Sequence, residues 1–285
     1  MSAAGWTAAN PERVLLSVRA RARARAAFLF PPREEMRLLR TGEAFQTHGM
    51  YSLSADSSDS IEIDCDGGRG LAGHVWGAGA ALAALLLSPE GRRRFLADRP
   101  DVVELGSGTG VAGLAAAAAG ASSVLLTDLP PAVPALAATA TRNAHVLEGC
   151  HVAAAPLAWA DASEVAHALA PSGCDLILAA DVLYSPDAAE QEALRGAMLA
   201  LAAPRGALVL HAYEERWDYV HEPWRRSLAG SGLRLQSEEE LQVPTTGADG
   251  APTLFSAPSE LGSVERRRLV LELLRVDDGE EAPGG

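Results

Sequence analysis

A glycine-rich stretch at residues 101–113, DVVELGSGTGVAG, contains the residue types and spacing best suited to binding a ligand. Its apolar start, residues 102–105, predicts a strand buried on both faces of a parallel sheet. Gly106, Gly108 and Gly110 then alternate, which removes the side chains that would keep a ligand away from the backbone. The Ala-rich run that follows predicts a helix whose N-terminus faces the same point. The stretch therefore predicts a site for a nucleotide-like or charged molecule.

Two cofactor classes fit these glycines. Gly108, Gly110 and Gly113 match G-x-G-x-x-G, the fingerprint of dinucleotide binding, while Glu104 extends the pattern to E-x-G-x-G-x-G. Asp128 ends the next predicted strand, where a carboxylate accepts hydrogen bonds from ribose hydroxyls in either class. The glycines alone leave the choice between these cofactors open.

Strand and helix signals alternate beyond the glycines at a spacing typical of α/β proteins. The last two predicted strands have no convincing helix signal between them, and we expect them to form an antiparallel pair on an otherwise parallel sheet. Strands are predicted at residues 102–105, 124–127, 151–156, 175–180, 207–212, 233–236 and 267–276, with helices at 74–87, 90–97, 111–119, 132–143, 162–169, 185–202 and 219–229.

The segment Asp181-Val182-Leu183-Tyr184 follows the fourth of these strands, where a dehydrogenase gives no reason to expect it. Together, ELGSGTG, TDLP and DVLY resemble the seven-strand S-adenosylmethionine-dependent methyltransferases, and specifically the family 16 group of protein lysine methyltransferases. The resemblance reaches from about Ile61 to the C-terminus.

This resemblance implies S-adenosyl-L-methionine as the cofactor and assigns its contacts. The glycine loop would carry the methionine end of the cofactor. Glu104 would bind the cofactor's ammonium or brace the loop, and Asp128 would bind the ribose. Trp76 would pack over the methionine part, where an aromatic face favours the sulfonium charge, and Trp159 and Ala180 would lie near adenine. The expected cofactor-binding residues are Trp76, Glu104, Gly106, Ser107, Gly108, Asp128, Trp159 and Ala180, and no metal is expected.

On the acceptor side, the resemblance implies Asp181 and Tyr184 as catalytic residues. A lysine ammonium must become neutral before it attacks, and a carboxylate with a tyrosine beside it suits that step. His211, Tyr213 and Arg216, in HAYEER, are expected to shape the substrate mouth, with no catalytic role for His211.

The implied partner is a protein substrate such as a chaperone or a translation factor. Alternatives are methylation of protein histidine or of a small molecule, a non-catalytic interaction module with a methyltransferase fold, and an NAD-binding Rossmann oxidoreductase.

The expected fold class is α/β, with a seven-strand class I methyltransferase (Rossmann-like) sheet whose last strand is antiparallel. We expect an N-terminal extension over residues 1–60, helical up to residue 41 and then extended as a small antiparallel pair from residue 50 to 64. The methyltransferase domain would occupy residues 61–276, with a flexible insertion at 244–263 and a disordered tail at 277–285.

The composition also bears on the partners and on the role of the cysteines. The net charge of −13 argues against nucleic acid as a partner, and all 24 basic residues are arginine. Cys65, Cys150 and Cys174 lack the spacing of a disulfide framework or a zinc site.

No apolar run reaches the length of a membrane span, so we expect no membrane partner. The predicted location is the cytoplasm, with the nucleus as an alternative. The acid-free segment at residues 13–33 is compatible with an organelle transit peptide or with an exposed helical lead-in. The sequence does not indicate the oligomeric state.

Overall fold

The structure is a computed structural model that describes residues 14–16, 48–54, 60–162, 166, 169–170, 172–241 and 268–277, the first two ranges as backbone only. The expected insertion at 244–263, the tail after Asp277 and the Arg-rich residues 17–33 lie outside these ranges.

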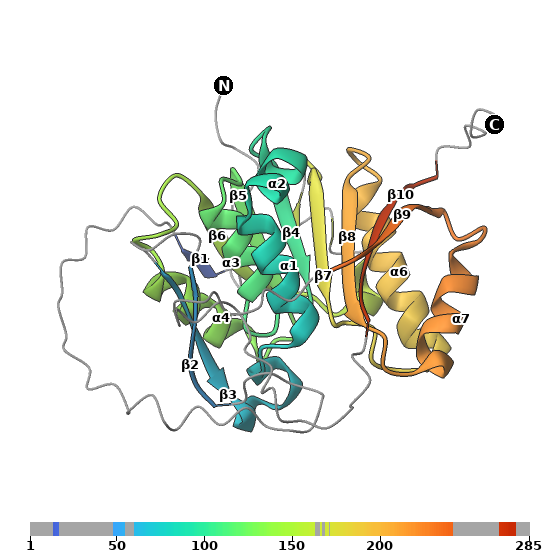
Figure 1. The fold of residues 1–285 in the computed structure, drawn as a ribbon, viewed down its shortest axis with the longest axis horizontal. Helices are drawn as coiled ribbons and strands as arrows, with labels where there is room; N and C mark the ends of the chain where they lie inside the picture. Colours follow the sequence, from blue (N-terminus) through green and yellow to red (C-terminus); the bar gives the residue numbers. More distant parts are fainter. Residues whose placement is uncertain are drawn as a thin grey trace.

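One eight-stranded sheet forms the centre of the described structure (Figure 1). Its strand order is β1-β6-β5-β4-β7-β8-β10-β9, in which the five strands from β6 to β8 are parallel and β10 runs antiparallel to both of its neighbours. This order confirms the predicted class I methyltransferase sheet. Its strands are β4 (Asp101–Leu105), β5 (Ser123–Asp128), β6 (His151–Pro156), β7 (Leu176–Ala180), β8 (Leu208–Glu214), β9 (Leu233–Glu240) and β10 (Leu269–Val276).

The eighth strand, β1 (Val14–Leu16), corrects the helical prediction at these three residues. It pairs antiparallel with β6, which would otherwise be the edge of the sheet. A short apolar run can satisfy the unpaired backbone groups of such an edge, and this outweighs its weak helical pattern.

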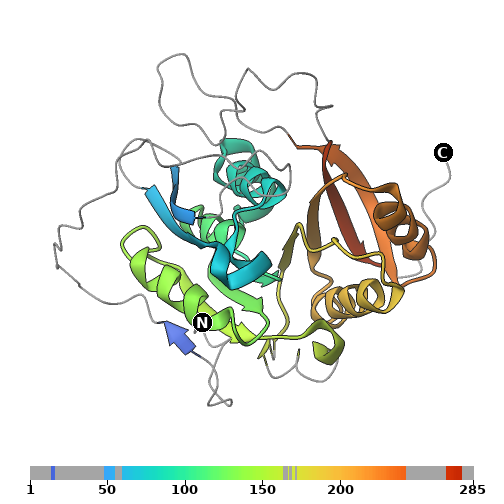
Figure 2. The same ribbon diagram turned by 90° about the horizontal axis from the view of Figure 1, so that it is seen from below.

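Helices cover both faces of the sheet (Figure 2). Neighbouring residues of each strand point to opposite faces, so that Val102 packs in one hydrophobic cluster and Val103 in the other. The first cluster is covered by α1 (Gly77–Leu87), α3 (Val111–Ala118) and α4 (Val133–Arg142), and the second by α6 (Ala188–Ala202) and α7 (Asp218–Leu228). No helix among the described residues is long and apolar enough to cross a membrane.

A separate hairpin forms the predicted accessory pair. It consists of β2 (His48–Ser54) and β3 (Ser60–Asp66), which are antiparallel. Asn143, fully buried at the end of α4, accepts a hydrogen bond from the backbone N–H of Glu62 and donates one to its carbonyl. The chain then passes through the 3₁₀ segment η2 (Gly67–Gly73) into α1, so the hairpin holds η2 beside the sheet.

The start of α2 agrees with the sequence prediction, whereas the starts of α6 and α1 differ from it. The Ser88-Pro89 pair in the sequence predicts a capped helix start, and Ser88 caps α2 (Pro89–Gly91) by accepting a hydrogen bond from the N–H of Gly91. The Ser185-Pro186 pair predicts that Ser185 caps the next long helix, but α6 is capped by Asp187, whose carboxylate accepts from the N–H of Ala189. Helix α1 begins after Trp76, which leaves that side chain outside the first turn.

A buried carboxylate joins β10 to β8 and α7. Glu272 is fully buried and accepts hydrogen bonds from the Tyr213 hydroxyl at 2.9 Å and the Trp224 Nε1–H at 2.9 Å, with the Nδ1 of His211 at 3.0 Å. Burial alone would raise the pKa of Glu272, but these partners hold it below its usual value. His211 and Tyr213 are therefore core residues, which corrects their expected place at the substrate mouth.

We predict that Glu272→Leu lowers the free energy of unfolding by about 3 kcal/mol or more, because it leaves three buried polar groups without their acceptor. Glu272→Gln should cost much less. Its amide oxygen can still face His211 and Trp224 while its NH₂ group donates to the Tyr213 hydroxyl. Urea denaturation of the three proteins measures this, and equal midpoints for wild type and Glu272→Leu would contradict it.

Candidate active site

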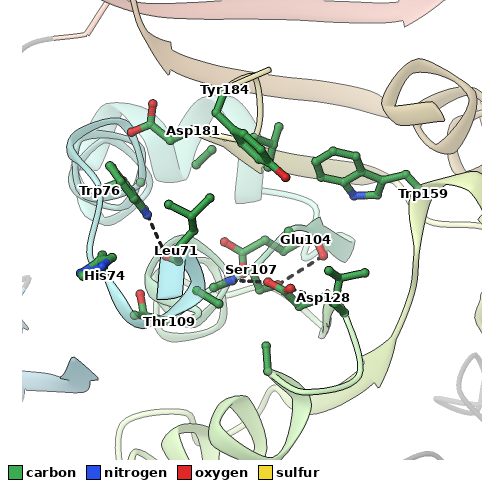
Figure 3. Close-up of a pocket in the computed structure, with 18 of the residues that line it drawn as sticks. Leu71, His74, Trp76, Glu104, Ser107, Thr109, Asp128, Trp159, Asp181 and Tyr184 are labelled. Carbon is green, nitrogen blue, oxygen red and sulfur yellow. Dashed lines mark hydrogen bonds between the residues drawn. The ribbon is translucent and has the colours of Figure 1, made fainter. Parts of the chain in front are cut away.

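A pocket of about 800 Å³ opens at the carboxyl ends of β4, β5 and β7 (Figure 3). This is the edge where α/β sheets bind ligands. All ten residues expected to bind the cofactor or act in catalysis line it. They come from the residue before α1, the glycine loop and the ends of four strands. The wall also includes Arg69, Leu71, His74, Thr109, Leu129, Glu190, Arg216 and Trp217.

The glycine loop is shaped by left-handed backbone and by close packing. Gly106 has φ of 60°, and a Cβ there would lie 2.8 Å from Val182 Cγ1 and 3.3 Å from Trp159 Cζ2. Ser107 ties the loop to β5, because its N–H donates to the Thr127 carbonyl and its hydroxyl accepts from the Thr127 N–H. The Ser107 side chain is thus used to hold the loop, and the loop's backbone is what faces a ligand.

Asp128 fixes the far side of the same loop. One carboxylate oxygen accepts from the N–H of Gly108 and the other from the N–H of Leu129, both at 2.7 Å. Burial raises the pKa of Asp128, and these two N–H groups oppose the rise. Each oxygen retains a further lone pair for a ligand hydroxyl, as ribose binding requires.

Glu104 lies beneath the loop with 3% of its surface exposed. Its Oε2 faces the start of α3 but makes no hydrogen bond with the described residues. Burial raises the pKa of the carboxyl to about 8, and the Ser107 side chain and the N–H groups of Gly113 and Ala112 offset this rise only in part. A buried carboxylate without a counter-charge is costly, so a cationic ligand group would complete this part of the pocket.

Two tryptophans stand on either side of the loop. The Trp76 Nε1–H donates to the Leu71 carbonyl at 3.0 Å, and the Arg216 guanidinium lies 5.3 Å from its ring centre. Trp159 begins the short turn η4 (Trp159–Asp161) after β6 and packs against Gly106. Trp76, Trp159 and Ala180 thereby form the apolar parts of the wall.

Asp181 is buried and fully hydrogen-bonded, with 2% of its side chain exposed. It accepts from the N–H of Ala78 and of Glu214, each at 3.2 Å, and from both terminal nitrogens of Arg216, at 3.1 and 3.3 Å. The Asp181 carboxylate is therefore half of an ion pair, and it also accepts a hydrogen bond at the N-terminus of α1. Sequence reasoning placed Arg216 at the mouth but had no signal for this pairing.

Tyr184, the other expected catalytic residue, is exposed, in contrast to the buried Asp181 side chain. Its side chain remains at the mouth with 46% of its surface exposed. Burial of the remainder, together with the negative charges of Glu190 and Asp128, raises the pKa of the phenol, so it carries its proton at neutral pH.

Residues 55–223 match the family model described as lysine methyltransferase. The chain belongs to the lysine methyltransferase family. The mouse protein "EEF1A lysine methyltransferase 3" is 30% identical over 177 residues, which cover 61% of this chain and 70% of the relative.

Solved structures with a similar fold include a putative S-adenosylmethionine-dependent methyltransferase from Streptococcus mutans, with a TM-score of 0.48, 13% identity and coverage of 80% of this chain and 55% of that one. Another is Pyrococcus horikoshii TYW2 in complex with MeSAdo, with a TM-score of 0.45, 14% identity and coverage of 81% and 73%.

Family membership confirms the predicted activity, S-adenosylmethionine-dependent methylation of protein lysine, and rejects the oxidoreductase alternative. The residues of this lysine methyltransferase fit its cofactor. The unpartnered Glu104 oxygen suits an ammonium, the Asp128 oxygens suit ribose hydroxyls, and the volume is in the range of small-molecule sites. Among the described residues no group of His, Cys, Asp and Glu is arranged to hold a metal ion.

We predict that Asp128→Ala raises the dissociation constant for S-adenosylhomocysteine at least tenfold, because it removes the ribose acceptor and frees the Gly108 N–H. Hydrogen bonds to a charged group contribute about 1.5–3 kcal/mol each. Isothermal titration calorimetry measures the change, with the exposed Asp98→Ala as the matched control. Equal affinity for the two variants would contradict the assignment.

The pKa of Glu104 predicts a pH dependence. Near pH 7 its carboxyl is protonated without ligand, and an ammonium ligand favours ionisation, so affinity for S-adenosylhomocysteine should rise as pH increases from 6 to about 8 and then level off. Calorimetry across this range should show the rise in wild type and a flat, weaker profile in Glu104→Gln.

The raised pKa of Glu104 also affects the stability of the ligand-free protein, and this effect runs opposite to the trend in affinity. Because the pKa of the folded state lies above the unfolded value, the contribution of Glu104 to ligand-free stability falls as pH rises from about 4.5 to 8. A wild-type affinity that is independent of pH would overturn the first expectation. A free energy of unfolding of the ligand-free protein whose pH dependence over this range is the same in wild type and in Glu104→Gln would overturn the second.

Proposed function

We propose that this lysine methyltransferase methylates a lysine of translation elongation factor 1A in the cytoplasm. The observation that carries the proposal is the 30% identity, over 177 residues, to a protein named as an EEF1A lysine methyltransferase. A translation factor is one of the two substrate classes that the sequence suggested, and a chaperone is the other.

In this proposal the glycine loop, from Gly106 to Gly108, carries the methionine end of the cofactor, and Glu104 pairs with its ammonium. Asp128 binds the ribose, Trp159 and Ala180 border the adenine, and Trp76 covers the methionine chain. Support comes from the packing of each side chain around one pocket and from the two carboxylates whose hydrogen-bonding capacity is unfilled.

The cofactor supplies a methyl group on a positively charged sulfur. An acceptor lysine would have to lose its ammonium proton to solvent before its nitrogen lone pair could accept that methyl group. Most of the rate in such a displacement comes from alignment and exclusion of water. The chain's contribution is therefore to hold the amine in line.

Tyr184 would contact the amine directly. Its phenol keeps its proton and can accept from, or donate to, the nitrogen at the mouth. Asp181 would act through its partners, since its carboxylate fixes Arg216 and the start of α1, and Arg216 in turn lies over Trp76. Both residues retain a role in turnover, one by contact and the other by positioning.

We expect purified enzyme to transfer label from methyl-labelled S-adenosylmethionine to elongation factor 1A, with methyl-lysine identified by mass spectrometry. The assay is clean because this chain contains no lysine, so any methyl-lysine belongs to the substrate. Label on a chaperone would replace the target, label on histidine or on a small molecule would replace the acceptor, and an intact cofactor site with no acceptor in any cell extract would favour an interaction module.

We further predict that Asp181→Asn depresses kcat at least tenfold while S-adenosylhomocysteine affinity stays within about threefold of wild type. An amide cannot accept from both Arg216 nitrogens, and breaking one side of a buried pair costs about 3–5 kcal/mol, so the melting temperature should fall as well. Kinetics below the lowered melting temperature separate the two effects, and undiminished turnover there would remove Asp181 from the mechanism.

A further inference from the structure

The pocket mouth gathers most of the exposed large apolar side chains of the described residues. Of the five such side chains, Leu71, Leu129 and Tyr184 line the pocket. A fourth, Tyr219, is 61% exposed and stacks on Trp217, a pocket residue, with ring centres 6.1 Å apart. Apolar side chains concentrated around one opening indicate a surface that contacts a partner.

Four carboxylates line the same pocket, and three of them are engaged or enclosed. Asp181 is paired with Arg216, Asp128 accepts two backbone N–H groups, and Glu104 is buried beneath the glycine loop. Glu190 is the exception. It is exposed, and its side chain has no hydrogen bond or ion pair with any residue that the structure describes.

Glu190 stands beside the phenol proposed to meet the amine. It lies in the first turn of α6, and its charge is one of those that raise the pKa of Tyr184. A carboxylate in the first turn also suits the helix dipole. An interaction with the helix dipole does not require the carboxylate to lie at the pocket mouth. Glu190 does lie there, exposed and unpaired, near apolar side chains that match the aliphatic stem of a lysine.

We propose that Glu190 is a specificity-determining and positioning residue for the acceptor. It attracts the target ammonium to the mouth beside Tyr184, while the Trp217–Tyr219 pair receives an apolar residue of the same segment. The occupant is an exposed loop of the substrate protein that carries a lysine next to an apolar side chain. This inference rests on the proposed function, since it concerns the acceptor of that same site.

In this role Glu190 affects binding of the substrate lysine and not the methyl transfer itself. A carboxylate stabilises the ammonium but not the neutral amine, so Glu190 helps the lysine to arrive and does not help it to attack. Its removal should therefore act on KM more than on kcat. Because the charge is exposed to solvent, its contribution should also be screened by salt.

The test compares Glu190→Gln with wild type in steady-state methylation of elongation factor 1A at 50 mM and 500 mM salt. We expect KM for the protein to rise about threefold to fivefold at low salt, the scale of one exposed ion pair, with kcat within twofold. At high salt the difference should disappear, and affinity for S-adenosylhomocysteine should be unchanged at both concentrations. Glu190→Asp should restore part of the low-salt KM.

Two further variants separate charge from packing. Glu222→Gln removes the same charge from an exposed surface pair on α7 and should leave KM unchanged. Tyr219→Ala should raise KM equally at both salt concentrations, because its contribution is apolar. A Glu190→Gln enzyme with wild-type KM, or with a fall in kcat alone, would overturn the inference while the proposed function stands.

Failure of the proposed function gives a different result. If the wild-type enzyme labels lysine in another protein, the target is replaced and the same KM comparison on that protein decides the role of Glu190. If it labels no lysine in any cell extract, both the proposed function and this inference are overturned.

Discussion

The Asp181 carboxylate is the interaction on which the pocket depends. It follows β7 in a left-handed conformation, with φ of 53°, and this turns its side chain towards α1 and β8. Its hydrogen bonds then join the start of α1, the end of β8 and Arg216 at one point, and Arg216 extends the junction to Trp76. A single side chain thus sets the distance between two walls of the site, which local packing of small residues in α1 could not do.

The strand order explains why the junction and the glycine loop face each other. From β4 the chain proceeds to β5 and β6 on one side, and then returns to β7 and β8 on the other. The loops that leave β4 and β7 therefore diverge, and a crevice forms between them at the carboxyl edge of the sheet. Gly106 lies where the two come closest, and any side chain there would strike Val182. Glycine is therefore needed at position 106, because only then can the loop after β4 pack against the loop after β7 at the floor of the pocket.

Much of this arrangement was predictable because it is local in sequence. Buried strands β4 to β8, the glycine turn and Asp128 each carry their own signal within a few residues, and β6 has the predicted bounds. Contacts between distant segments had no such signal. The pairing of Asp181 with Arg216, the burial of His211 and Tyr213 around Glu272, and the edge position of β1 all depend on which elements become neighbours. Asp187 was missed as a cap because Ser185 and Asp187 are both good capping residues two positions apart.

The four pocket carboxylates show how burial assigns different states to one residue type. Asp181 is paired with Arg216, backbone N–H groups oppose the rise in the pKa of Asp128, burial raises the pKa of Glu104 to about 8, and Glu190 is exposed to solvent. Two of these groups have incomplete partners: Glu104 lies beneath the glycine loop, and Glu190 lies at the mouth. Both substrates of a lysine methyltransferase carry an ammonium group. Glu104 would pair with the ammonium of the cofactor once that group is bound, whereas the exposed charge of Glu190 would attract the ammonium of the acceptor lysine, so burial gives the two groups separate tasks.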